Sequence, residues 1–125
     1  MVQESKVVVV AARWMPHDVS NSALALGCGD IATLMPPMAD IPEAFTRHSN
    51  PWVRLFVDWF YLGLDRMTAV PKDGIDKDRA LRHIMCVMRS FEPKHEHKTA
   101  ACAYLLSQWF TRIDYTVNGQ SRTAA

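Results

Sequence analysis

The sequence predicts a mainly α-helical protein: a small helical bundle with a central buried helix, an antiparallel helix pair and an irregular N-terminal arm. Three observations lead to this fold class. The stretch from Pro51 to Leu64 is apolar over most of a helical circumference, which indicates a helix that other elements enclose. Residues 77–91 and 94–112 each divide into one apolar and one polar face at helical spacing. Only Glu92 and Pro93 separate these two stretches, and such a short connection predicts antiparallel neighbours.

Length and composition indicate one globular domain. The chain has 125 residues, of which 49% are hydrophobic and 22% charged, as is ordinary for a soluble domain. A net charge of +1 gives no overall support for nucleic-acid or membrane binding. Three cysteines without regular spacing argue against a disulfide framework and fit a reducing compartment. No apolar run reaches the roughly 18 residues that a transmembrane helix needs. We therefore expect a cytoplasmic protein without membrane contact and without a cofactor.

The N-terminal third carries few structural signals. Residues 1–37 are expected to form an arm or extension, in which the β-branched run from Val7 to Ala12 could be a strand. From Asp40 onward a capping residue followed by proline predicts a short helix near 42–46. The helical domain is then expected to span residues 38–114.

The central helix has clear boundaries. Asn50 is a favourable N-cap ahead of a proline at the first helical position, and Gly63 marks the C-terminal end. Arg54, Asp58 and Tyr61 fall on one narrow polar stripe. Since Arg54 and Asp58 stand four residues apart, we expect them to pair on the exposed side.

The remaining elements follow from turn and capping signals. Residues Asp65 to Ile75 contain proline and an Asp-Gly pair and are expected to be a linker. Asp76 then caps the helix at 77–91. After the helix at 94–112, Tyr115-Thr116-Val117 before Asn118-Gly119 could form a strand and a turn. Residues 120–125 beyond this turn are too polar to complete a hairpin and are expected to fray, so residues 115–125 are interpreted as a C-terminal tail.

A basic face on the two downstream helices is the predicted partner-binding surface. Its cations could contact the acidic surface of a protein or, as an alternative, the phosphates of a nucleic acid. Interleaved Asp and Glu residues cancel part of this field. The candidate residues are Arg79, Arg82, Arg89, Lys94 and Lys98.

Histidine and cysteine residues in the same region raise two further possibilities. His83, Cys86, His95 and His97 have the residue types of a zinc site, but helical spacing does not bring them to one point. Cys86 stands among cations beside His83, as a reactive thiol would. No recognised catalytic or phosphate-binding motif accompanies them. We therefore expect no metal and no enzymatic activity, with a small zinc-binding domain kept as an alternative.

Four segments between Ile41 and Phe110 resemble small uncharacterised bacteriophage and prophage accessory proteins. The segments are IPEAF, NPWVRLFVDWFYLGL, GIDKDRALRHIM and SFEPKHEHKTAACAYLLSQWF. The resemblance implies a protein that binds and modulates a host complex and does not catalyse a reaction. The expected function is therefore a non-catalytic protein-interaction module, a phage-encoded modulator or inhibitor of a host complex. A nucleic-acid-binding helical domain is the alternative.

Overall fold

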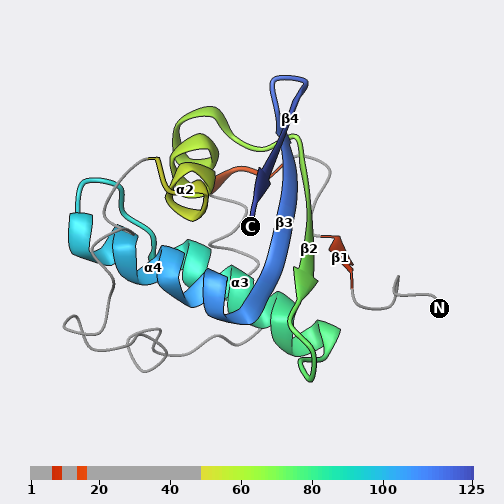
Figure 1. Ribbon diagram of the computed structural model, residues 1–125. Helices are drawn as coiled ribbons and strands as arrows, with labels where there is room; N and C mark the ends of the chain where they lie inside the picture. The colour runs from red at the N-terminus through yellow and green to blue at the C-terminus, as the bar shows by residue number, and fades with distance from the viewer. Residues whose placement is uncertain (1–6, 10–13, 17–48) are drawn as a thin grey trace.

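The computed structural model describes residues 7–9, 14–16 and 49–125, and these form a mixed α/β fold (Figure 1). Three helices in this part of the chain pack on one face of a four-stranded antiparallel sheet. The prediction of a mainly helical bundle is therefore wrong. In chain order the elements are β1 (Val8–Val9), α2 (Pro51–Leu62), β2 (Arg66–Pro71), α3 (Lys77–Ser90), α4 (Glu96–Trp109), β3 (Phe110–Val117) and β4 (Gln120–Ala124).

The strands lie in the order β1-β2-β3-β4, and every neighbouring pair is antiparallel. β3 and β4 form a hairpin around Asn118 and Gly119, whose φ angles are 49° and 78°. Two successive positive φ angles give the turn that best matches the twist of antiparallel strands. The Asn-Gly pair in the sequence thus marks the turn of a complete hairpin.

β3 follows a period of two, which the helical interpretation of residues 94–112 overlooked. Ile113, Tyr115 and Val117 are buried, and the residues between them face outward. Alternation of this kind is typical of a strand with one face on the core. Helix α4 ends at Trp109 because Phe110 adopts an extended backbone, with φ −123° and ψ 143°.

β2 and β4 replace the expected linker and the expected tail. In β2 the alternate residues Met67, Ala69 and Pro71 are buried, although only the first of them has a long side chain. β4 lies at the edge of the sheet, and Ala124 is its one fully buried residue. An edge strand with so small an inward face carries little hydrophobic signal, so its polar composition resembled that of a tail.

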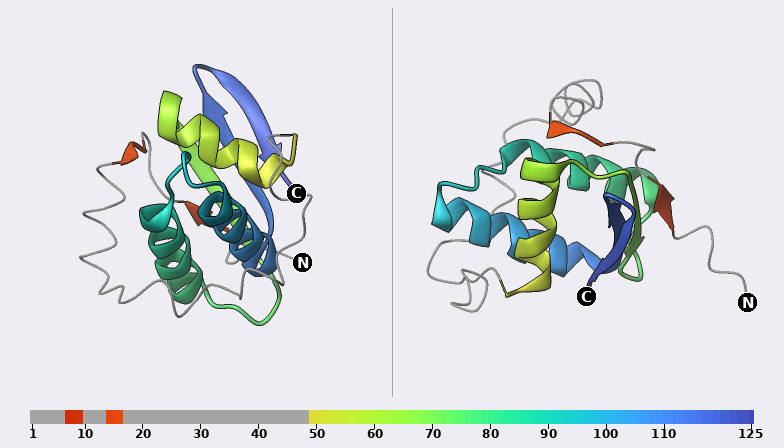
Figure 2. Two further views of the ribbon diagram at one scale, coloured as in Figure 1. Left: turned by 90° about the vertical axis from the view of Figure 1, so that its left-hand side faces the viewer. Right: turned by 90° about the horizontal axis from the view of Figure 1, so that it is seen from above.

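All three described helices cover the same face of the sheet (Figure 2). α4 contacts both α2 and α3, and the core fills the space between these helices and the inner face of the sheet. The largest fully buried side chains come from every layer: Trp14, Phe56, Phe110, Leu55, Leu64, Met67, Ile84, Met88, Leu106, Ile113 and Val53.

The predicted helix caps are confirmed, but α2 is less enclosed than expected. The Asn50 side chain accepts a hydrogen bond from the Trp52 amide at 2.9 Å, and Asp76 accepts one from the Arg79 amide at 2.8 Å. At the C-terminal end of α2, however, Phe60 is 40% exposed, and Tyr61 and Leu62, which follow it, are more exposed still. The helix therefore buries one side and leaves its last turn open.

Part of the N-terminal arm belongs to the core. Val8 pairs opposite Ala69 in the sheet, and Trp14 is buried with its ring centroid 6.3 Å from that of Trp59. The backbone of Trp14 also exchanges two hydrogen bonds with Leu64. Apart from residues 7–9 and 14–16, residues 1–37 lie outside the described residues, as do Cys28 and the expected helix near 42–46.

Candidate binding surface on the outer face of the sheet

The pairing register places the outward side chains of three strands side by side. Arg66, Thr116 and Ser121 form one row across β2, β3 and β4. Thr68, Asp114 and Thr123 form the next row. Successive residues of a strand point to opposite faces of the sheet, so these rows lie on the face away from the helices. None of the described helices covers that face.

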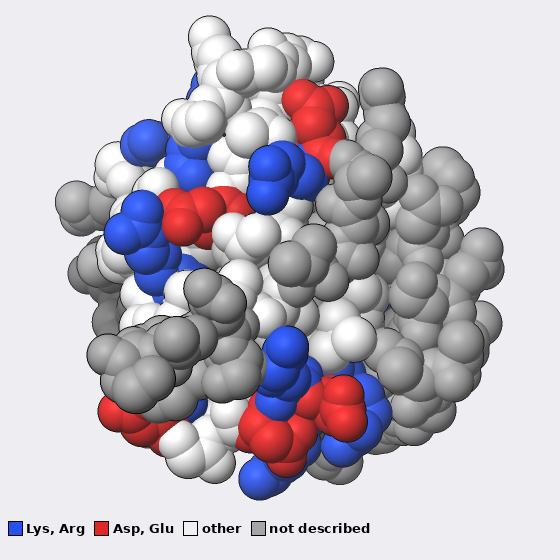
Figure 3. Space-filling model, turned by 90° about the vertical axis from the view of Figure 1, so that its right-hand side faces the viewer, with Lys and Arg blue, Asp and Glu red and all other residues white. Residues whose placement is uncertain are grey.

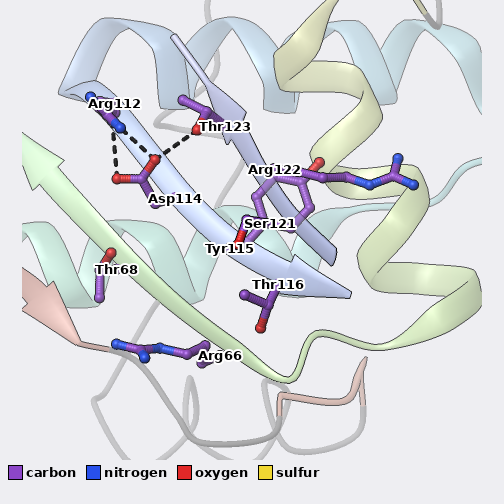
Figure 4. Close-up of a pocket in the computed structure, with 9 residues that line it drawn as sticks. All are labelled: Arg66, Thr68, Arg112, Asp114, Tyr115, Thr116, Ser121, Arg122 and Thr123. Carbon is purple, nitrogen blue, oxygen red and sulfur yellow. Dashed lines mark hydrogen bonds and ion pairs between the residues drawn. The ribbon is translucent and has the colours of Figure 1, made fainter. Parts of the chain in front are cut away.

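These two rows border a shallow pocket of about 340 Å³ (Figure 4). Seven of its nine lining residues belong to the outer face or its margin: Arg66, Thr68, Arg112, Asp114, Thr116, Ser121 and Thr123. The other two, Tyr115 and Arg122, extend toward α2 (Figure 4). The pocket is therefore lined by hydroxyl groups and guanidinium groups around a single carboxylate.

Asp114 is the fixed point of this surface. Nε of Arg112 donates to both of its carboxylate oxygens at 3.0 Å, and the Thr123 hydroxyl donates to Oδ1 at 2.7 Å. Both members of the ion pair remain partly exposed, so the pair contributes little to stability. It does neutralise the one negative charge that lines the pocket.

The row of Arg66, Thr116 and Ser121 is different, because its polar side chains have no partners among the described residues. Within the described part of the chain, neither the Arg66 guanidinium nor the two hydroxyl groups form a hydrogen bond or an ion pair. Arg66 and Ser121 are exposed and Thr116 is half-buried. This row therefore offers one cation and two hydroxyl donors to a ligand.

On the inner side of the same strands, a buried cluster fixes α2 to the sheet. Oδ2 of Asp58 accepts a hydrogen bond from the Tyr115 hydroxyl at 2.9 Å and another from Nη1 of Arg122 at 3.2 Å. Burial, together with the hydrogen bond to Asp58 and its negative charge, raises the pKa of Tyr115 above its usual range. The expected exposed pair of Arg54 and Asp58 is wrong, since Asp58 turns to the sheet.

The sequence-predicted basic residues lie on a different surface. Arg79, Arg82 and Arg89 are all exposed on α3, and the guanidinium carbon of Arg79 lies 5.5 Å from the ring centroid of Trp109. Lys94 is exposed beyond the end of that helix, whereas Lys98 contacts the Glu92 carboxylate at 3.5 Å. The helical periodicity located these exposed cations but gave no sign of Arg66 and Arg112, because the strands that carry them were not predicted.

The predicted metal candidates do not come together. His83 is buried and its ring stacks on Trp109 at 3.7 Å, and His95 contacts Glu92 at 2.9 Å. His97 is exposed. No group of three or more His, Cys, Asp or Glu residues among those the structure describes is placed to hold a metal ion.

The polar face expected for His83 and Cys86 is also wrong, since both side chains are buried. Burial, and then the charge of Arg79, lower the pKa of His83 to about 4, although a hydrogen bond to the Leu105 backbone acts in the opposite direction. Cys86 is disulfide-bonded, which the cysteine count did not predict. It therefore offers no thiolate to a substrate.

Charges of both signs are interspersed on the side of the molecule away from the helices (Figure 3). Lys and Arg side chains lie beside Asp and Glu, with uncharged atoms between the groups. On the two outer rows and their margin, Arg66 and Arg112 outnumber Asp114, which leaves a local charge of +1. A surface of mixed charge with a net +1 suits a ligand that carries a few specific polar groups better than it suits a uniformly acidic ligand.

No protein-family model matches the chain, and neither the search of curated proteins nor the search of solved structures found a match. Among the described helices, none is both long enough and apolar enough to cross a bilayer.

Proposed function

We propose that the protein is a non-catalytic binding protein that contacts a protein partner through the outer face of its sheet. The observation that carries this proposal is the polar pocket of about 340 Å³ bordered by the unpartnered row Arg66, Thr116 and Ser121. Hydroxyl and guanidinium groups of this kind are adaptable hydrogen-bond donors at protein interfaces.

The chemistry of the outer face supports binding over catalysis. Its described residues include no histidine, cysteine or lysine beside a hydroxyl group. A hydroxyl nucleophile needs an adjacent base and a group that stabilises developing negative charge. The one carboxylate, Asp114, is already occupied by Arg112 and Thr123. These features support the expectation that the protein is not an enzyme.

Nucleic-acid binding is less well supported by the same face. Sheets that bind single strands present aromatic rings on which bases stack. Among the pocket residues the single aromatic is Tyr115, and its hydroxyl group is bonded to Asp58 on the inner side. A duplex reader would also need a more strongly basic surface than a local charge of +1.

The resemblance to phage accessory proteins favours a bacterial host protein as the partner, which this protein would modulate or inhibit. The disulfide at Cys86 argues against the cytoplasmic location expected from the sequence, since such bonds are rare in the cytosol.

Photo-crosslinking in bacterial cells tests the proposal. A photoreactive amino acid is placed at Ser121 on the outer face, at Arg82 on the basic side of α3, or at Gln108 on α4; all three positions are exposed. We expect one discrete crosslinked protein from position 121, abolished by excess untagged wild type, and none from position 108. If a specific crosslinked protein forms from position 82 and none forms from position 121, the interface lies on α3 and the proposal is wrong.

A further inference from the structure

We propose that the row Arg66, Thr116 and Ser121 is an oxyanion site that binds a phosphate monoester carried by the protein partner. This inference rests on the proposed function, because it names the group that the outer face recognises. It follows from three features of the row: unused donors, spacing and local charge.

The first feature is the number of unused donors. Arg66 contributes a planar guanidinium with several N–H groups, and Thr116 and Ser121 contribute one hydroxyl each. None of the three side chains is engaged by another described residue. A phosphate monoester presents three terminal oxygens, each of which can accept from one of these three side chains. A carboxylate has only two oxygens in one plane, so it matches three donors along a row less well than a tetrahedral phosphate does.

The second feature is the spacing across the strands. Arg66 pairs with Thr116, and Thr116 pairs with Ser121, so the three residues occupy one line perpendicular to the strands. Neighbouring strands lie about 4.8 Å apart, and opposed Cβ atoms on one face are about 5 Å apart. A tetrahedral anion above Thr116 would therefore lie within reach of both hydroxyl groups. The Arg66 guanidinium extends away from Thr116 in Figure 4, and a change of rotamer would turn it toward the anion.

The third feature is the charge beside the row. Asp114 stands two residues along β3 from Thr116, roughly 7 Å away at the usual strand rise. Its ion pair with Arg112 offsets the repulsion that it would exert on an anion. Arg112 uses only Nε toward Asp114, which leaves its terminal nitrogens available to the phosphate or to the peptide around it.

Titration with phosphoserine, followed by ¹H–¹⁵N NMR of the whole protein at constant ionic strength, tests the site. We expect saturable shifts of the Thr116 and Ser121 amides, with weaker effects from acetate. Arg66→Gln should weaken binding by about tenfold or more, since it removes a charge-assisted hydrogen bond. The matched control, Arg89→Gln on α3, loses the same charge elsewhere and should change affinity by less than twofold. Asp114→Asn should strengthen binding about two- to fivefold by removing a nearby negative charge.

The outcomes separate this inference from the proposed function. Non-saturable shifts, equal binding of acetate and phosphoserine, or equal effects of Arg66→Gln and Arg89→Gln would each overturn the phosphate site. The crosslink from position 121 would survive such a result if the outer face binds an unphosphorylated protein. Conversely, saturable phosphoserine binding without any crosslink would refute the protein-partner proposal and retain the oxyanion site. When the irradiation is done in a cell extract instead, phosphatase treatment of the extract before irradiation should abolish the crosslink if both proposals hold.

Discussion

The buried Asp58 carboxylate should be the most sensitive polar group in the described part of the fold. Its side chain is 9% exposed and accepts hydrogen bonds from Tyr115 and Arg122. Asp58→Ala would leave the buried Tyr115 hydroxyl without a partner, at a cost of about 1–3 kcal/mol. Arg122 is 36% exposed and can regain water, so the lost ion pair adds only about 1 kcal/mol. We expect a total loss of about 2–4 kcal/mol in the free energy of unfolding.

Urea denaturation followed by tryptophan fluorescence measures this loss. Asp114→Ala is the matched control, because Asp114 also pairs with an arginine but lies on the outer face of β3, the strand that carries Tyr115. It should cost no more than about 1 kcal/mol. In a double-mutant cycle, Asp58→Ala and Tyr115→Phe should show a coupling of about 1–2 kcal/mol. Equal losses for the two aspartate variants, or no coupling to Tyr115, would refute the argument that burial sets the strength of this cluster.

Two further predictions concern pH and backbone geometry. The pKa of His83 is lowered from 6.5 to about 4 in the folded protein. Between these two pH values His83 is protonated in the unfolded chain but stays neutral in the folded state, so acidification favours unfolding. The free energy of unfolding should therefore fall by at most about 3 kcal/mol between pH 7 and pH 4. His83→Asn should remove this part of the pH dependence, and the control His97→Asn should leave it intact. If urea denaturation shows the same change of stability with pH for wild type and His83→Asn, the prediction is wrong. Gly119→Ala should lower the free energy of unfolding by about 1–2 kcal/mol, because residue 119 has a positive φ angle. Gly63→Ala should lower it further, because the added Cβ would also collide with the Met15 side chain. Thermal unfolding of both glycine variants compares them directly, and equal costs would rule out the Met15 contact.

Local capping chemistry made the helix starts predictable from the sequence. Asn50 and Asp76 act through their immediate neighbours, so their roles depend on a few residues only. The sheet depends on partners far apart in the chain. Met67 lies opposite Tyr115 across the β2–β3 pair, and nothing in either segment alone specifies that contact.

The candidate site was missed for the same reason. Arg66 stood in a segment expected to be a linker, and Ser121 in one expected to fray. Their proximity arises only when β2, β3 and β4 pair. Together with the Asn118-Gly119 turn, the alternation of Ile113, Tyr115 and Val117 with polar residues was a local signal that could have revealed β3.

Partner capture by two charge-reversal variants is the most direct test of the central claim, that the outer face of the sheet is the binding surface. Arg66→Glu and Arg89→Glu change charge equally at exposed positions on opposite layers of the protein, and both are compared with wild type at equal folded concentration. We predict that Arg66→Glu reduces capture of the crosslinked partner at least about tenfold while Arg89→Glu retains it. Retention by Arg66→Glu together with loss by Arg89→Glu would contradict the claim and assign binding to α3.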